Sequence, residues 1–169
     1  MFLQSQNRVK SISLVHEKLY QTTNFSRIDF DKYLKTFIPH LFQTFSIPSD
    51  KIVYRIKADN IFLNTETAIP CGLIINEIVT NSLKHAFNTA EKGEVYLELI
   101  YHTDNYITLI AGDNGSGIPD KIDFAKSGTL GFQLISLLTK QLNGNIDLKR
   151  QNGTEYKIKF AISDYKSDR

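Results

Sequence analysis

The sequence predicts an α+β domain, a two-layer α/β sandwich in which helices cover one face of a mixed, mostly antiparallel sheet. Two observations lead to this fold. Segments whose apolar residues have helical spacing are interspersed with short segments whose apolar residues alternate with polar ones. Several of the strand-like segments follow one another across short turns, which favours antiparallel hairpins.

The first half of the chain supplies two helices and one or two strands. Apolar residues repeat at helical spacing over 8–20 and again over 30–45, where Pro39 is expected to kink or split the helix. Residues 51–57 alternate apolar and basic side chains, as a half-buried strand does. Residues 61–64 could add a second short strand.

The middle of the chain predicts a helix, a hairpin and a loop. The helix runs over about 67–87, with Pro70 in its first turn, where proline is tolerated. Strands are expected at 94–102 and 106–111, joined by a short turn. A loop rich in Gly, Asp, Lys and Ser then runs over 113–129.

The last part predicts one helix and two strands. The helix covers about 130–142 and ends at Asn143-Gly144, a pair typical of a helix C-terminus. Strands follow at 145–150 and 155–162, on either side of the turn 151–154.

Composition limits the domain count and the compartment. With 169 residues, of which 41% are hydrophobic, the chain can bury one good core, so we expect one domain with a small appendage. The net charge of +2 gives no field strong enough to argue for nucleic acid or an anionic membrane as a partner, and we expect neither. A single cysteine, Cys71, fits the reducing cytoplasm. No apolar run of about 20 residues or signal peptide occurs, so a membrane anchor of the parent protein would lie outside this chain.

The middle helix carries three polar side chains on one face. Helical geometry places Glu77 and Asn81 one turn apart, with Lys84 close by. A magnesium nucleotide needs such groups: an oxygen for the cation, a positive charge for the phosphates and a carboxylate that can orient or deprotonate a nucleophile. A solvent-exposed helix face is the alternative for this segment taken alone.

The segment Asp113-Asn114-Gly115-Ser116-Gly117 directly follows an apolar strand. An acidic side chain at a strand end can accept a hydrogen bond from an exocyclic amine, and the two glycines let the backbone turn tightly beside a ligand. The alternative is an ordinary turn after an edge strand.

Two more glycine-containing segments follow. Gly128-Thr129-Leu130-Gly131-Phe132 stands before a helix, where free backbone N–H groups and the helix dipole favour a phosphate; a plain capped helix start is the alternative. Gly153-Thr154 lies between the last two strands and by itself fits any hairpin turn.

The order and spacing of these four segments resemble the N, G1, G2 and final boxes of the ATPase superfamily of gyrase, heat-shock chaperones, histidine kinases and mismatch-repair proteins. The resemblance covers roughly residues 28–163. Within the superfamily, residues 73–87 and 130–135 look like histidine kinases related to the HWE group. Residues 14–20 resemble the end of the dimerisation and phosphotransfer hairpin of those kinases.

This resemblance implies two parts and one activity. Residues 1–25 would be a remnant of the phosphotransfer hairpin, and 26–169 the ATP-binding catalytic domain. The domain would transfer the γ-phosphate of ATP to a histidine in a cytoplasmic two-component system, with a response regulator downstream and a homodimeric parent kinase. The family's acceptor histidine precedes the matching segment, so the chain is expected to begin too late to contain it; His16 has the context of a packed structural histidine.

By similarity, the Asn81 oxygen would ligate Mg²⁺, Lys84 would contact phosphates and Asp113 would bind the adenine amine. Glu77 is the expected general base, although many histidine kinases carry Asn at this position. The remaining ATP-binding residues implied by the resemblance are Gly115 and Gly117, which would open a lid over about 118–127, the segment Gly128, Thr129, Leu130 and Gly131 at the phosphates, and Thr154 beside the adenine.

Two other functions remain open at this stage. One is a regulatory module that binds nucleotide or a partner without catalysis, which the intact boxes argue against. The other is a serine kinase or ATPase on the same fold, such as an anti-sigma-factor kinase, which the hairpin-like first residues disfavour.

Overall fold

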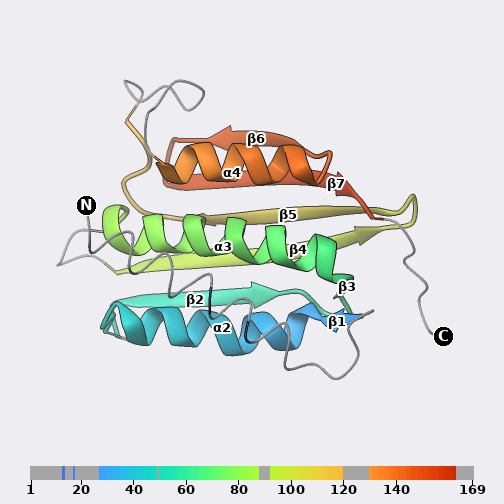
Figure 1. Cartoon of the computed structure of the whole chain (residues 1–169). Coiled ribbons are helices and arrows are strands. Elements are labelled where there is room, and N and C mark those ends of the chain that lie inside the picture. Colours follow the sequence, from blue (N-terminus) through green and yellow to red (C-terminus); the bar gives the residue numbers. More distant parts are fainter. Residues whose placement is uncertain are drawn as a thin grey trace.

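Five strands form one continuous sheet in the order β2-β4-β5-β7-β6 (Figure 1). The computed structural model describes residues 27–48, 50–87, 92–119 and 130–162, together with Ser13 and Glu17. The edge strand β2 pairs parallel with β4, and the other three pairings are antiparallel. The strands are β2 (Ile52–Lys57), β4 (Gly93–His102), β5 (Tyr106–Asp113), β6 (Asn145–Lys149) and β7 (Thr154–Ala161).

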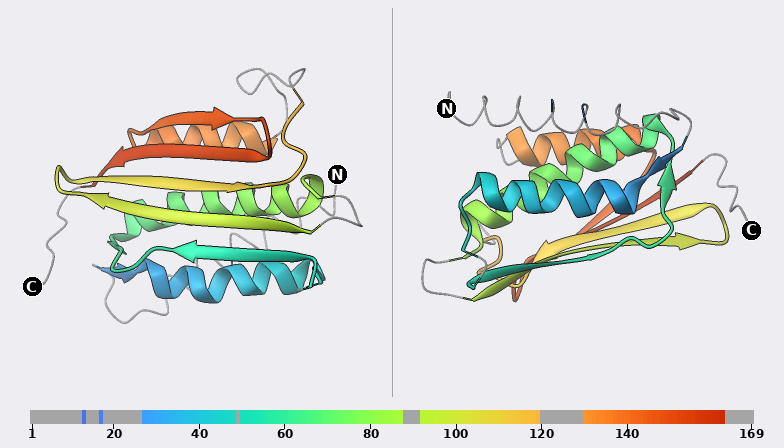
Figure 2. Two further views of the ribbon diagram at one scale, coloured as in Figure 1. Left: turned by 180° about the vertical axis from the view of Figure 1, so that it is seen from behind. Right: turned by 90° about the horizontal axis from the view of Figure 1, so that it is seen from below.

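Three helices lie side by side on one face of this sheet, as the view from below in Figure 2 shows. They are α2 (Phe30–Thr44), α3 (Thr65–His85) and α4 (Leu130–Gln141). A separate two-stranded sheet joins β1 (Ile28–Asp29) to β3 (Phe62–Leu63). The predicted fold class, a two-layer α/β sandwich with a mixed, mostly antiparallel sheet, is therefore confirmed.

The core fills the space between the helices and the sheet. Alternate residues of β4 are buried, and their neighbours on the opposite face are more exposed, because side chains along a strand point to opposite faces. The helices contribute their apolar stripes to the same layer. The largest fully buried side chains are Phe30, Phe37, Phe160, Ile28, Leu34, Ile38, Leu63, Ile74, Ile75, Ile78 and Leu97.

Helix α2 begins at a side-chain cap and continues through its proline. Asp29 caps it by accepting a hydrogen bond from the Lys32 N–H at 3.0 Å. Pro39 lies inside the helix, so the predicted split does not occur there. The carbonyl that loses its partner is that of Lys35, an exposed residue, where water can replace the missing N–H.

Helix α3 begins two residues earlier than the sequence predicts. The side chain of Asn64 caps it by accepting from the Thr67 N–H at 2.9 Å, and Glu66 lies in the first turn. Pro70 is consequently the sixth residue of the helix rather than a member of its first turn, which corrects the prediction. The early start lengthens the helix that carries Glu77 and Asn81.

Two residues predicted to lie in loops or turns belong to strands. Asp113 is the last residue of β5, and Thr154 is the first residue of β7. The two face each other in the antiparallel pairing of these strands. The chain leaves α4 at Asn143, whose φ of 50° is left-handed, and the Gly144 N–H donates to the Thr139 carbonyl, so the predicted helix end is confirmed.

Most of the predicted helix over 8–20 lies outside the described residues. Within it, Ser13 and Glu17 are both helical. Among the described residues, no helix is both long enough and apolar enough to cross a bilayer.

Candidate functional site

Asp113 lies at the end of β5 with a strand on either side. Its backbone is paired with Val95 of β4 and with Thr154 of β7. The residue is only 3% exposed, so its carboxylate is held inside the protein at the edge of the helical layer. A carboxylate so placed is costly to bury unless it has hydrogen-bond donors.

Two neutral donors meet that carboxylate. The Ser82 hydroxyl of α3 donates to Oδ2 at 2.6 Å, and the Gly115 N–H donates to Oδ1 at 3.0 Å. No ion pair involves Asp113 in the part of the chain that the structure describes. The negative charge of Asp113 also affects Tyr156. Burial is the main cause that raises the pKa of the Tyr156 hydroxyl, and the Asp113 charge is the second.

The two glycines after Asp113 pack closely on neighbouring backbone. A Cβ on Gly115 would stand 2.2 Å from the Ala86 carbonyl oxygen, and one on Gly117 would stand 2.2 Å from that of Arg150. Gly117 also has a φ of +75°, a backbone conformation that residues other than glycine rarely adopt. The tight turn that the sequence predicts at these glycines is therefore packed against the protein's own backbone.

The loop after β5 is also fixed by hydrogen bonds to two other elements. The Ser116 N–H donates to the Ala86 carbonyl at the end of α3, at 2.8 Å. Asn114 accepts from the Glu94 N–H at 2.7 Å through its side chain, and its own N–H donates to the Glu94 carbonyl at 3.2 Å. The segment beside Asp113 is thus anchored to α3 and β4 before it continues to Pro119.

The three candidate residues of α3 differ in exposure. Glu77 is 5% exposed, Asn81 is half-buried and Lys84 is exposed. Lys84 extends towards the end of α2, where its Nζ lies 5.4 Å from the centre of the Phe45 ring. Asn81 directly precedes Ser82, so the hydrogen bond to Asp113 places this turn of α3 beside the end of β5.

The start of α4 lies at the same end of the sheet as Asp113 (Figure 1). Gly131 is buried there and Leu130 is 61% exposed. Gly128, Thr129 and most of the predicted lid lie outside the described residues. The structure thus brings Asp113, Gly115, Gly117 and Thr154 together.

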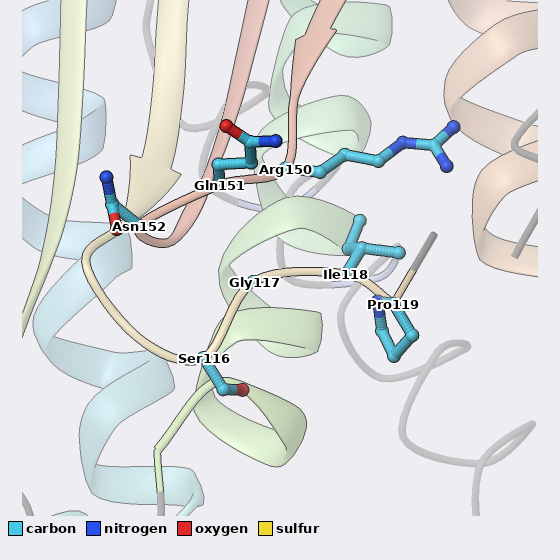
Figure 3. Close-up of a pocket in the computed structure, with 7 residues that line it drawn as sticks. All are labelled: Ser116, Gly117, Ile118, Pro119, Arg150, Gln151 and Asn152. Atoms are coloured by element: carbon cyan, nitrogen blue, oxygen red, sulfur yellow. The ribbon is translucent and has the colours of Figure 1, made fainter. Parts of the chain in front are cut away.

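A hollow of about 500 Å³ lies next to this loop, between it and the turn that joins β6 to β7 (Figure 3). Arg150 extends past Ile118 in this view, and of the described residues that line the hollow it is the one cation and none is acidic. The lining residues are Ser116, Gly117, Ile118, Pro119, Arg150, Gln151 and Asn152.

Three residues of this region are not among the candidates predicted from the sequence. The helical spacing offers a signal for Ser82. It lies four residues after Ile78 and seven after Ile75 on the apolar stripe of α3, where a buried hydroxyl needs a polar partner. The two hydrogen bonds between Asn114 and Glu94 depend on strand pairing, which no local pattern reveals. The same is true of the position of Arg150 beside the loop.

Comparison with known proteins gives matches at both ends of the chain. Residues 1–45 match a histidine kinase family, and 67–164 match the histidine kinase-, DNA gyrase B- and HSP90-like ATPase family. Blue-light-activated histidine kinase 2 of Erythrobacter litoralis is 30% identical over 117 residues, 69% of this chain and 34% of that protein. Sensor histidine kinase PdtaS of Mycobacterium tuberculosis is 25% identical over 164 residues, 95% of this chain and 32% of that protein.

A solved structure shares the fold. The histidine kinase domain of the Erythrobacter litoralis EL346 blue-light activated histidine kinase superposes with a TM-score of 0.80 at 24% identity, covering 93% of this chain and 74% of that one. The chain spans about a third of the length of the curated relatives it matches. It belongs to the histidine kinase-, DNA gyrase B- and HSP90-like ATPase family, whose match covers residues 67–164.

Proposed function

We propose that this chain is the ATP-binding catalytic part of a cytoplasmic two-component sensor histidine kinase. It binds ATP with Mg²⁺ and transfers the γ-phosphoryl group to a histidine on the phosphotransfer hairpin of a homodimeric kinase, from which a response regulator receives it. The observation that carries the proposal is the buried Asp113 carboxylate, which is held by Ser82 and Gly115 at the end of a strand within the matched ATPase region.

The Asp113 carboxylate fits an adenine amine. Each of its oxygens has one donor in the described structure, and a carboxylate oxygen can accept more than one hydrogen bond. An exocyclic N–H of adenine would take a remaining lone pair, and Thr154, paired with Asp113, would line the same pocket. Gly115 and Gly117 let the loop beside it pack against the backbone of Ala86 and Arg150.

The α3 residues fit the phosphate end of the nucleotide. Asn81 offers an amide oxygen for Mg²⁺, and among the described residues no group of three or more His, Cys, Asp or Glu side chains could hold a metal ion alone. Such a donor set suits Mg²⁺ that keeps waters and nucleotide phosphates as its other ligands. The cation would neutralise charge on the β- and γ-phosphates.

Two further groups would bind the phosphates. Lys84 can swing from the Phe45 ring to phosphate oxygens, because its side chain is exposed. The start of α4, with the segment Gly128 to Gly131 before and at its first turn, would donate backbone N–H groups to the same oxygens.

Phosphoryl transfer then needs little covalent chemistry from the protein. An imidazole nitrogen of the acceptor histidine forms a bond to the γ-phosphorus as the bond from that phosphorus to the bridging oxygen breaks, and ADP leaves. Glu77, one turn before Asn81, would orient the imidazole and take its N–H proton. Positioning and charge neutralisation supply the rest of the rate enhancement.

Calorimetric titration with a non-hydrolysable ATP analogue, with and without Mg²⁺, tests the binding site. We expect magnesium-dependent binding that Asp113→Ala weakens at least about tenfold, because a buried charge-assisted hydrogen bond is lost. Asn81→Ala should lose the magnesium-dependent part of the affinity. Asp147→Ala removes an exposed carboxylate from β6 and serves as the matched control. Equal affinities for wild type and Asp113→Ala would refute the site.

The acceptor is tested separately. The chain is mixed with a histidine-bearing phosphotransfer hairpin and labelled ATP, and the product is challenged with acid. Acid-labile phosphate on the hairpin, reduced in Glu77→Gln, is the expected result. Acid-stable phosphoserine would instead identify a serine kinase on the same fold, and nucleotide binding without any transfer would identify a regulatory module.

A further inference from the structure

Ser82 joins α3 to the sheet at the residue proposed to bind the adenine amine. Its hydroxyl oxygen lies 2.6 Å from Oδ2 of Asp113, the short distance that is typical of a hydroxyl donating to a carboxylate. The two residues are 4% and 3% exposed and lie 31 positions apart in the chain. The contact is therefore a tertiary one, made inside the protein.

The direction of this hydrogen bond sets what the pair can offer to a ligand. The Ser82 hydroxyl donates its proton to Oδ2 of Asp113, and Oδ1 of Asp113 accepts from the Gly115 N–H. Both the hydroxyl and the carboxylate are then left with lone pairs only. The pair can accept hydrogen bonds from a bound molecule but has no proton to give to one.

Three other hydroxyls on the described helices donate within their own helix. Thr36, Thr44 and Thr139 each donate to the carbonyl four residues earlier, the usual choice for a hydroxyl within a helix. Ser82 instead donates across to the sheet. This difference points to a role for Ser82 in holding Asp113 rather than in the helix itself.

We infer that Ser82 is a specificity-determining positioning residue, which fixes Asp113 as an acceptor and selects 6-aminopurine over 6-oxopurine nucleotides. The inference rests on the proposed ATP site. A 6-amino group donates N–H to the fixed carboxylate, whereas a 6-oxo group would place an acceptor against buried acceptors. Without Ser82 one carboxylate oxygen loses its donor, and the side chain is free to turn away from the amine.

The experiment compares ATP with inosine triphosphate, which carries an oxygen in place of the 6-amino group. Dissociation constants of both are measured by calorimetry for wild type, Ser82→Ala and Ser82→Thr. We expect wild type to prefer ATP about 100-fold, Ser82→Ala to bind ATP about tenfold more weakly with little change for inosine triphosphate, and Ser82→Thr to recover the preference. The ratio of the two constants is unaffected by a partly unfolded sample.

The matched control is Thr139→Val. It removes another buried hydroxyl, near the C-terminal end of α4, and should leave the ratio of the two dissociation constants unchanged. If Ser82→Ala does not fold, Ser82→Cys replaces it, because the thiol is a weaker donor and should lower the ratio by a smaller factor.

Two failures are distinguishable. The first failure concerns Ser82 alone. It occurs if Ser82→Ala, or Ser82→Cys, keeps the wild-type preference for ATP over inosine triphosphate while ATP binding still depends on Asp113. A wild-type protein that binds neither nucleotide, or binds both without any dependence on Asp113, overturns the proposed nucleotide site itself.

Discussion

Asp113 is the residue at which the parts of the site meet, and the backbone beside it leaves no room for side chains. Gly153 has a φ of +103°, and a Cβ there would stand 2.0 Å from the Asp113 carbonyl oxygen. The obstacle is backbone rather than the end of a flexible side chain. The turn between β6 and β7 therefore depends on this glycine for both its conformation and its packing.

Gly153→Ala should lower the free energy of unfolding by about 2–4 kcal/mol, since it adds left-handed strain to a steric clash. Urea denaturation measures the change. The neighbouring Asn152 has a φ of 58°, so Asn152→Gly is the matched control and should change stability by less than about 1 kcal/mol. A Gly153→Ala protein as stable as wild type would contradict the packing described.

At the level of single residues, the sequence predicts those that act through local spacing. Asp113, Gly115 and Gly117 follow an apolar strand in order, and that pattern is readable along the chain. The spacing does not predict Ser82, because its partner is 31 positions away. The local pattern predicts a turn at Thr154, because only the pairing with Asp113 extends β7 to include it.

Among the helices, α2 shows how packing stabilises an element that contains a proline. Phe37 is fully buried and stacks on Tyr33, with ring centres 5.2 Å apart. Tyr33 in turn stacks on Phe30. This aromatic row lies on the face of α2 that points into the core, so tertiary burial compensates for the hydrogen bond lost at Pro39.

Phe37→Ala should cost about 3–5 kcal/mol of stability, because it leaves a large cavity under α2. Leu137→Ala is the control, since Leu137 is 63% exposed on α4 and its truncation should cost less than about 1 kcal/mol. Thermal or urea unfolding of both variants makes the comparison. Similar losses for the two would mean that α2 is not held by its buried face.

Across the open face of the sheet, three strands are joined through Glu155. Lys149 donates to its Oε1 at 2.7 Å and Tyr96 to its Oε2 at 3.0 Å. Tyr96 reaches across β5 because the residue between them in the register is Gly112, which has no side chain. The Lys149 hydrogen bond, and then that of Tyr96, lower the pKa of Glu155 against the opposing effect of burial.

This lowered pKa gives a testable pH dependence. A carboxyl whose pKa is lower in the folded state stabilises the protein above its ordinary pKa of 4.5, and the contribution is lost as the pH falls through the folded value. The stability deficit of Glu155→Gln should therefore be present at pH 7 and shrink below pH 4.5. Lys149→Gln should show the same trend, and a deficit independent of pH would contradict the network.

For the elements, local patterns predicted most of the layout. The hairpin of β4 and β5 and the helix α4 follow from alternation, helical spacing and turn residues. The parallel pairing of β2 with β4 did not, because it joins segments on either side of α3. Helix α3 begins before the predicted start because its cap is a single residue, Asn64, outside the periodic pattern.

On the scale of the whole molecule, the site gathers at one end of a sheet that carries its helices on one face. The end of α3, the end of β5 and the start of α4 converge there (Figure 1). Asp113 has its donors, Ser82 and Gly115, only when α3 and the loop after β5 are packed against it. A nucleotide that binds this arrangement would bind the folded state alone.

Binding should therefore stabilise the whole domain. At a free concentration 100 times its dissociation constant, Mg-ATP should add about 2.7 kcal/mol to the free energy of unfolding, which raises the midpoint of thermal unfolding by roughly 5–10 °C for a chain of this size. Asp113→Asn keeps the shape of the side chain but replaces one carboxylate oxygen with an NH₂ donor, so at the same ATP concentration its midpoint should move far less. Scanning fluorimetry with and without nucleotide measures both shifts. Equal shifts in the two proteins would mean that ATP binds elsewhere on the fold, because the folded site described above loses its acceptor in the variant.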